Sequence, residues 1–162
     1  MAKTYDVSKN RSEIKEIKSD LEKKKGRLEQ LEEQKQQLLD AVTSIEGTKI
    51  DDDVKQVVRE SINSALEANR GKGQELSSEM GQEIRRVEEI KQETMESSAE
   101  AQNRKSELER KKKLLDRFGI GGALDKATGR LETNISELGE VKDDAIEMMR
   151  ELEKTSQKAG SL

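Results

Sequence analysis

Apolar residues recur at alternating intervals of three and four along most of this chain. Such heptad spacing is typical of helices that pack side by side along a narrow apolar seam. The 162 residues include no proline and 41% of them are charged, so long polar helices are favoured over a thick globular core. In the first third of the chain the seam comprises Ile14, Ile17, Leu21, Leu28, Leu31, Leu38, Val42 and Ile45, with Lys24 and Lys35 at the same spacing.

Two breaks interrupt the pattern. The stretch SIEGTKIDDD (44–53) combines a glycine with three aspartates suited to capping a new helix. The stretch FGIGGA (118–123) is a second, glycine-rich break. We therefore predict an all-α fold with helices at about 8–46, 51–118 and 122–158, forming a single elongated helical domain over 1–162. Gly71 and Gly73 leave a rival open, in which the second helix breaks and four helices form a shorter bundle.

Short connections make neighbouring helices antiparallel, so the seam residues predict which positions face each other. In the first hairpin, facing residue numbers should add to about 97, as those of Leu31 and Leu66 do, and Lys24 then falls opposite Gly73. In the second hairpin the numbers should add to about 239. Both registers use one continuous central helix, flanked by two shorter helices in tandem. The expected architecture is a pair of elongated antiparallel hairpins that resemble coiled coils.

Further apolar residues flank the seam without joining it. A layer of two helices cannot cover so wide a stripe, and exposed apolar patches mark interfaces. We expect self-association or a helical protein partner along this face; the alternative is that flanking positions simply tolerate stray apolar residues. The candidate partner-binding residues are Leu39, Val57, Ile90, Met95, Leu114, Phe118, Ile146 and Met148.

The residue types argue against catalysis. The chain has no cysteine and no histidine, which removes thiolate chemistry, the commonest general base and the commonest transition-metal ligand. No glycine cluster has the spacing of a phosphate-binding loop. Consecutive aspartates at 51–53 point apart, so helix capping is favoured over a calcium site. We expect no catalytic, cofactor-binding or metal-binding residues, and no enzymatic activity.

The charge pattern bears on partners and location. Net charge is −4 with both signs interleaved, which argues against nucleic acid as the principal partner. The basic runs at 23–25 and 111–113 have acidic residues close by and no interleaved aromatics, and we interpret the second as complementing a helix dipole. No apolar run approaches the roughly 20 residues that span a bilayer. We expect no membrane insertion and a cytoplasmic location, with export by a route that needs no cleaved signal left open.

The turn sequence RFGIGG (117–122) has a plain structural interpretation. Phe118, Gly119, Gly121 and Gly122 form the turn of a helical hairpin, in which Gly119 adopts the left-handed conformation that ends a helix. On this interpretation Phe118 and Ile120 plug the end of the apolar seam.

The same turn also carries a resemblance. A helical hairpin whose turn has an aromatic residue followed by glycine, here Phe118-Gly119-Ile120-Gly121, resembles the WXG superfamily of type VII secretion substrates. More distantly it is similar to the helical partners of LXG-type toxins. The resemblance implies a non-enzymatic bacterial subunit that pairs with another helical protein for presentation to a secretion machine. The alternatives are a cytoplasmic homodimeric coiled-coil scaffold, a phage structural component, or a nucleic-acid-associated helical module.

Overall fold

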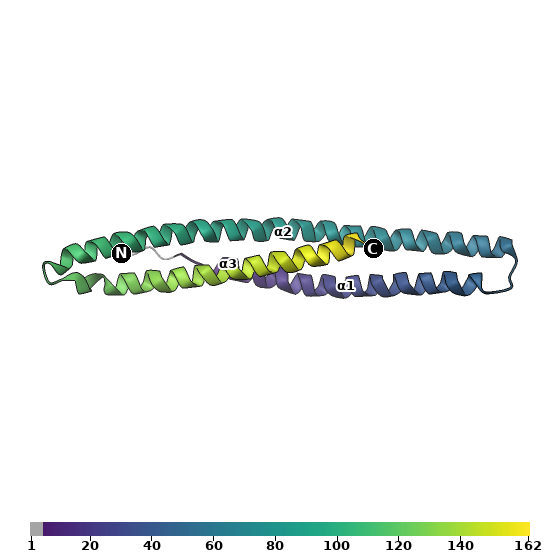
Figure 1. The fold of residues 1–162 in the computed structure, drawn as a ribbon, viewed down its shortest axis with the longest axis horizontal. Coiled ribbons are helices and arrows are strands. Elements are labelled where there is room, and N and C mark those ends of the chain that lie inside the picture. The colour runs from purple at the N-terminus through teal and green to yellow at the C-terminus, as the bar shows by residue number, and fades with distance from the viewer. Residues whose placement is uncertain (1–4) are drawn as a thin grey trace. The chain divides into compact units, whose positions relative to one another are not determined.

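The computed structural model describes residues 5–162, most of which lie in three α-helices (Figure 1). α1 spans Ser8–Glu46, α2 spans Asp52–Asp116 and α3 spans Asp125–Gly160, preceded by the short 3-10 helix η1 at Gly121–Leu124. The predicted all-α class, with hairpins around a long central helix, is confirmed. The bounds of α1 are those predicted, and the ends of α2 and α3 shift by one to three residues, which is the usual uncertainty of helix ends.

α2 is one uninterrupted helix of 65 residues, so the rival four-helix layout is wrong (Figure 1). Asp52 and Asp53 lie in its first turn and Lys113 in its last turn, where each sign of charge complements the helix dipole. The helix continues through Gly71 and Gly73 because an isolated glycine costs only about 1 kcal/mol relative to alanine. The glycine at 73 is also packed, as described below.

The contacts within the chain divide it into two compact units. Unit 1 comprises Met1–Ile17 and Arg85–Arg150, and unit 2 comprises Lys18–Ile84 and Glu151–Leu162. All three α-helices therefore contribute to both units. The single elongated domain predicted from the sequence stays a prediction, which small-angle scattering would test.

Unit 1 contains the α2–α3 hairpin and the first turns of α1. Arg86 of α2 pairs with Glu13 of α1 at 2.5 Å, and Arg11 of α1 pairs with Glu140 of α3 at 3.0 Å. Lys105 and Glu132 form an ion pair across the hairpin, and their numbers add to 237, close to the predicted 239. The N-terminal part of α1 is thus a third helix beside this hairpin.

Unit 2 contains the α1–α2 hairpin and the last turns of α3. The Lys35 ammonium donates a hydrogen bond to the carbonyl oxygen of Leu162 at 2.9 Å, and the hydroxyl groups of Ser77 and Ser156 are 2.9 Å apart. Asn69 Nδ2 donates to the carbonyl of Leu31, three residues from the predicted facing residue Leu66. The C-terminal part of α3 is therefore a third helix beside this hairpin.

Within each unit a part of α1 contacts a part of α3, whereas the prediction placed the two helices in tandem. In unit 1 an α1 residue meets the α3 residue 129 positions later, and in unit 2 the offset is 127. In unit 1 the same offset of 129 joins Tyr5 to Asn134 and Arg11 to Glu140, so the N-terminal segment runs parallel to α3 there. Three helices give each overlapping part a deeper core than a two-helix layer provides.

Burial follows the number of helices. In the three-helix parts most apolar side chains are buried. In the two-helix part of each hairpin most are half-buried or exposed, and Ile62, at 8% exposure, is an exception. The buried set includes Ile14, Leu21, Leu28, Leu31, Leu76, Met80, Val87, Val141, Ala145 and Leu152. The half-buried set includes Leu38, Val42, Ile45, Val58 and Leu66 in unit 2 and Leu108, Leu115 and Leu124 in unit 1.

The seam of α3 differs from the expectation. Intervals of three and four from Leu124 through Leu131, Leu138, Ala145 and Leu152 predict Ile135, Lys142 and Met149 in the seam, but all three are only half-buried. The fully buried positions are one residue earlier, at Asn134, Val141 and Met148, and continue to Thr155 and Ala159. The reason is that α3 contacts two helices, which moves the centre of its buried stripe.

Candidate functional site

Within residues 5–162, no group of three or more acidic side chains is arranged to hold a metal ion. No helix of that part of the chain has the length and apolarity needed to cross a membrane. The surface of the described helices has open hollows in which another molecule could dock.

The eight predicted partner-binding residues do not form one face. Five of them are exposed, namely Leu39, Val57, Met95, Leu114 and Phe118, and Ile146 is half-buried. Ile90 and Met148 are buried, at 0% and 5% exposure, so their assignment to a partner surface is wrong. The prediction failed there because the first turns of α1 cover the α2–α3 hairpin of unit 1, which a two-helix layer would have left open.

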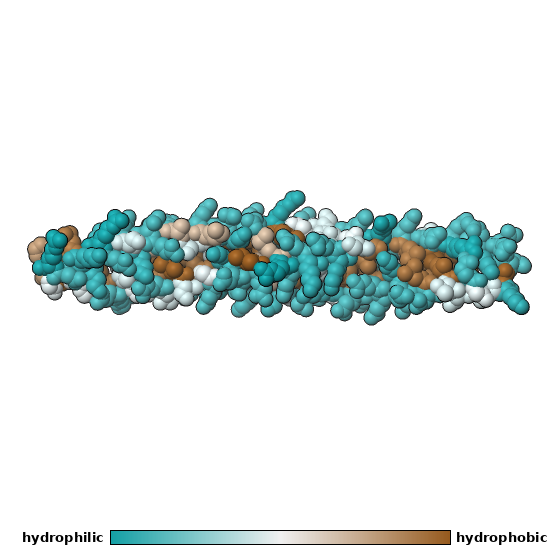
Figure 2. All heavy atoms as spheres, viewed as in Figure 1, coloured by the Kyte–Doolittle hydropathy of each residue, from teal (hydrophilic) through white to brown (hydrophobic). Residues whose placement is uncertain are grey.

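One open groove lies on the α1–α2 hairpin of unit 2. This hairpin groove has a volume of about 410 Å³ and is lined by Gln34, Gln37, Leu38, Ala65, Ala68, Asn69 and Lys72. A second hollow of about 310 Å³ shares Gln34 and Lys72 with it and continues between the helices to Arg27 and Glu79. Helical spacing places Val57, which is 65% exposed, on the same side of α2 as Ala65 and Ala68. Figure 2 shows hydrophobic surface over this hairpin.

The groove lies in the two-helix part of unit 2. Where the end of α3 packs on the hairpin, Leu28 and Leu76 are buried. Past that end, the equivalent seam residues Leu38 and Leu66 are half-buried and Val57 is exposed. The hairpin therefore retains apolar surface of the kind that a third helix covers elsewhere in the same unit.

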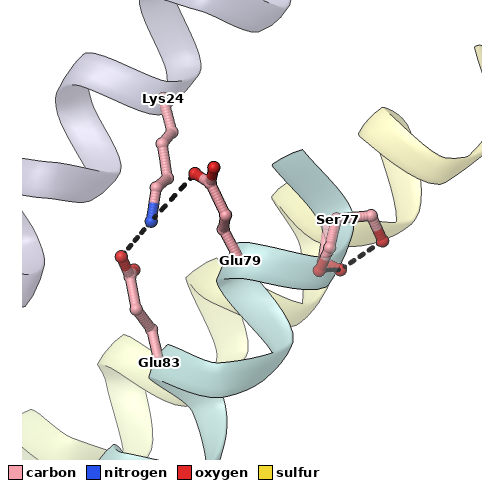
Figure 3. A network of polar contacts seen from close by, with 5 residues as sticks. Lys24, Ser77, Glu79 and Glu83 are labelled. Carbon is pink, nitrogen blue, oxygen red and sulfur yellow. Dashed lines mark hydrogen bonds and ion pairs between the residues drawn. The ribbon is translucent and has the colours of Figure 1, made fainter. Parts of the chain in front are cut away.

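Small and polar residues let the end of α3 approach α2 closely. A Cβ atom on Gly73 would lie 2.5 Å from the Ala159 carbonyl oxygen and 2.7 Å from Leu162 Cδ1. The predicted register places Lys24 opposite Gly73. In the structure Lys24 instead pairs with Glu79 and Glu83 of α2 (Figure 3). The long lysine side chain reaches along the helix pair to these carboxylates, which leaves Gly73 to the end of α3.

The α2–α3 turn has the backbone expected of it. Gly119 has φ +77°, the Gly119 N–H donates to the Asp116 carbonyl at 3.0 Å, and the Ile120 N–H donates to the Leu115 carbonyl at 3.1 Å. This pair of bonds is the Schellman motif that ends many helices at a glycine. Gly121 is buried, and a side chain there would collide with Asp116, so the position requires glycine; Gly122 is exposed.

The side chains of this turn differ from the expectation. Phe118 is 75% exposed and Ile120 is 56% exposed, so neither plugs the end of the seam. The Schellman hydrogen bonds involve only backbone atoms, so the turn itself does not need an aromatic residue at 118.

One ion pair lies at each hairpin turn. The Asp125 carboxylate accepts a hydrogen bond from Lys112 at 2.6 Å and raises the pKa of that ammonium. At the α1–α2 turn, a hydrogen bond from Arg59 lowers the pKa of Glu46 below its ordinary value. In unit 1 the pKa of Tyr5 is raised above its ordinary value. The larger cause is desolvation of its side chain by burial, and the second is the nearby Glu100 carboxylate.

Sequence reasoning missed several polar residues that organise the helix contacts. Asn69 and Asn134 are buried and bind backbone atoms of Leu31 and Tyr5. Asn69 and Gly73 continue the heptad spacing between Leu66 and Leu76, so a seam that admitted polar and small residues would have included them.

No family model, curated protein or solved structure matches this chain.

Proposed function

We propose that this chain is a non-enzymatic interaction subunit that binds a helix of another protein in the hairpin groove of unit 2. The observation that carries the proposal is the change in burial along the α1–α2 hairpin, where Leu28 and Leu76 are buried under α3 and Leu38 and Leu66 are half-buried past its end. An apolar stripe of this kind is the usual recognition surface for an amphipathic helix.

The lining of the groove fits a helical occupant. Ala65 and Ala68 are small, which allows the close approach of a helix backbone, as Gly73 does for the end of α3. Leu38, Ala65 and Ala68 form the apolar strip of the groove. Hydrogen-bonding groups around this strip come from Gln34, Gln37 and Lys72. A partner helix would therefore present apolar residues at intervals of three and four with polar residues at its margins.

The finer proposal is that the partner is a secreted bacterial effector, for which this chain acts as a targeting subunit. It is supported by the resemblance of Phe118-Gly119-Ile120-Gly121 to the turn of the WXG superfamily and by the charged helical hairpins. The family pattern places one residue between the aromatic and the glycine, whereas Gly119 follows Phe118 directly. The alternative is a homodimeric scaffold or phage structural component, in which the same groove binds a second copy.

The test is affinity capture of the full chain from its native host, with a photo-crosslinking residue in place of Val57. We expect one helical protein to be captured stoichiometrically. Ala65→Glu should abolish capture because a carboxylate would enter the apolar strip, whereas Asn63→Glu, at an exposed position on the opposite side of α2, should not. Equal capture by both variants would contradict the proposal.

Light scattering on the purified chain separates the two kinds of occupant. A dimer that Ala65→Glu dissociates and Asn63→Glu does not would identify a second copy in the groove and favour the scaffold. Retention on heparin that fades with modest salt would instead favour the nucleic-acid-associated module.

A further inference from the structure

The α2–α3 turn carries exposed apolar side chains that the fold does not use. Leu114, Phe118 and Ile120 are 56%, 75% and 56% exposed, and Phe118 is the only phenylalanine of the chain. Leu114 lies in the last turn of α2, and Phe118 and Ile120 follow in the turn directly after it. Figure 2 shows hydrophobic surface at the end where α2 meets α3.

Basic residues surround these side chains. Residues 110–126, here named the basic tip, contain six basic and two acidic residues, a net charge of +4 on a chain of net charge −4. Lys112 is paired with Asp125. Arg110, Lys111, Lys113, Arg117 and Lys126 form no ion pair with any described residue.

In the sequence, the basic run 111–113 has acidic residues close by and no interleaved aromatic residue, which by itself argues against membrane-surface binding. The structure changes this, because Phe118 faces solvent instead of closing the seam. An exposed aromatic and aliphatic cluster beside unpaired cations is the combination that holds a protein at the interface of an anionic bilayer.

The other hairpin turn provides a contrast within the same chain. Residues 46–57, here named the acidic tip, also expose apolar side chains, at Ile50, Val54 and Val57. They contain two basic and four acidic residues, a net charge of −2. An anionic surface would repel the acidic tip. Comparing the two tips therefore distinguishes the effect of exposed apolar side chains, which both tips have, from the effect of positive charge, which only the basic tip has.

We propose that the basic tip binds the surface of an anionic membrane. Leu114, Phe118 and Ile120 enter the interfacial region, and Lys111, Lys113 and Arg117 lie among the lipid phosphates. This is attachment of a turn to one face of a bilayer and involves no spanning helix. The inference is independent of the proposed helix-binding groove, which lies in unit 2.

Tryptophan fluorescence tests the proposal directly because the chain has no tryptophan. Phe118→Trp places a single reporter in the basic tip, and Val57→Trp places a matched reporter in the acidic tip. With vesicles of phosphatidylcholine and phosphatidylglycerol, the emission of Phe118→Trp should shift to shorter wavelength and be quenched by brominated acyl chains. Neither change should occur with phosphatidylcholine alone or with Val57→Trp. Equal shifts for the two reporters would overturn the proposal.

Co-sedimentation of the unlabelled chain with the same vesicles measures affinity. Binding should fall as salt rises. Phe118→Ser should weaken it by about tenfold or more, from the loss of a buried aromatic side chain. Lys111→Glu with Lys113→Glu should also weaken it, and Ile50→Ser should leave it unchanged.

Two results would contradict membrane attachment. If Phe118→Ser binds vesicles as well as the parent chain, the contact is electrostatic and no side chain inserts. If the Phe118→Trp emission shifts with protein concentration in the absence of vesicles, a second copy covers the tip instead. Circular dichroism of each variant, expected to match the parent spectrum, shows that the helices are intact.

Discussion

Gly73 of α2 lies against the backbone of Ala159 near the end of α3, so close that a Cβ atom on Gly73 would lie 2.5 Å from the Ala159 carbonyl oxygen. This contact explains why a glycine occupies the middle of a long helix. Gly71, one half-turn away, has no atom within 4 Å of the equivalent Cβ position. The two glycines therefore respond to the same substitution with opposite signs.

Gly73→Ala should destabilise the chain by about 1–3 kcal/mol, because the end of α3 must move away from α2. Gly71→Ala should stabilise it by about 0.5–1 kcal/mol, because alanine is the better helix former and nothing obstructs its methyl group. Urea denaturation followed by circular dichroism measures both changes. Equal stability of the two variants would show that α3 does not pack at Gly73.

Lys24 should contribute to stability through its carboxylate partners. It pairs with Glu83, and the two side chains are only 12% and 15% exposed (Figure 3). Lys24→Met should cost about 1–3 kcal/mol, because it leaves the Glu83 carboxylate buried without its cation. Combining it with Glu83→Leu should recover most of that loss, since no unpaired charge remains.

The control for Lys24 is its neighbour Lys25, which is 38% exposed and pairs with Glu22 on the surface. Lys25→Met should change the free energy of unfolding by less than about 0.5 kcal/mol. If the two lysine variants are equally stable, the Lys24 pair is no stronger than a surface ion pair.

Asn134 should hold the N-terminal segment onto α3. Its side chain is buried, accepts a hydrogen bond from the Tyr5 N–H at 2.7 Å and donates one to the Tyr5 carbonyl at 2.7 Å. Asn134→Ala should cost about 1–3 kcal/mol because both Tyr5 backbone groups lose their partner. Amide exchange at the Tyr5 N–H should accelerate strongly, whereas Asn103→Ala, at an exposed position of α2, should leave it unchanged.

Glu46 makes the α1–α2 turn sensitive to acid. Its pKa in the folded chain is below the ordinary value of 4.5, chiefly because Arg59 donates a hydrogen bond to its carboxylate. A lowered pKa means that the unfolded chain takes up the proton first. The stabilising effect of the pair is therefore present above the unfolded pKa and is lost as pH falls through the folded one.

Carbon-13 NMR titration of the Glu46 carboxyl group measures this pKa. Arg59→Gln should return it towards 4.5, and Lys55→Gln should move it less, because Lys55 acts only through a weaker charge interaction. A Glu46 that titrates at its ordinary value in the parent chain would show that the Arg59 contact does not persist in solution.

The helices were predictable because their signals are local. The bounds of α1, the glycine turn at Gly119 and most seam residues follow from spacing within one or two turns. The partner surface was less predictable. Exposure of Ile90 and Met148 depends on α1 residues more than seventy positions away in the chain, and no periodicity within α2 or α3 reports on them.

The amino-acid sequence by itself determined that this chain forms three charged helices joined in antiparallel hairpins, because the spacing of apolar side chains along a helix sets which face it must bury. Only the tertiary structure decided where a third helix covers each hairpin and where it stops. That outcome depends on contacts between segments more than a hundred residues apart, such as Arg11 with Glu140 and Lys35 with Leu162. It buries Ile90 and Met148, and it leaves the groove at Leu38 open.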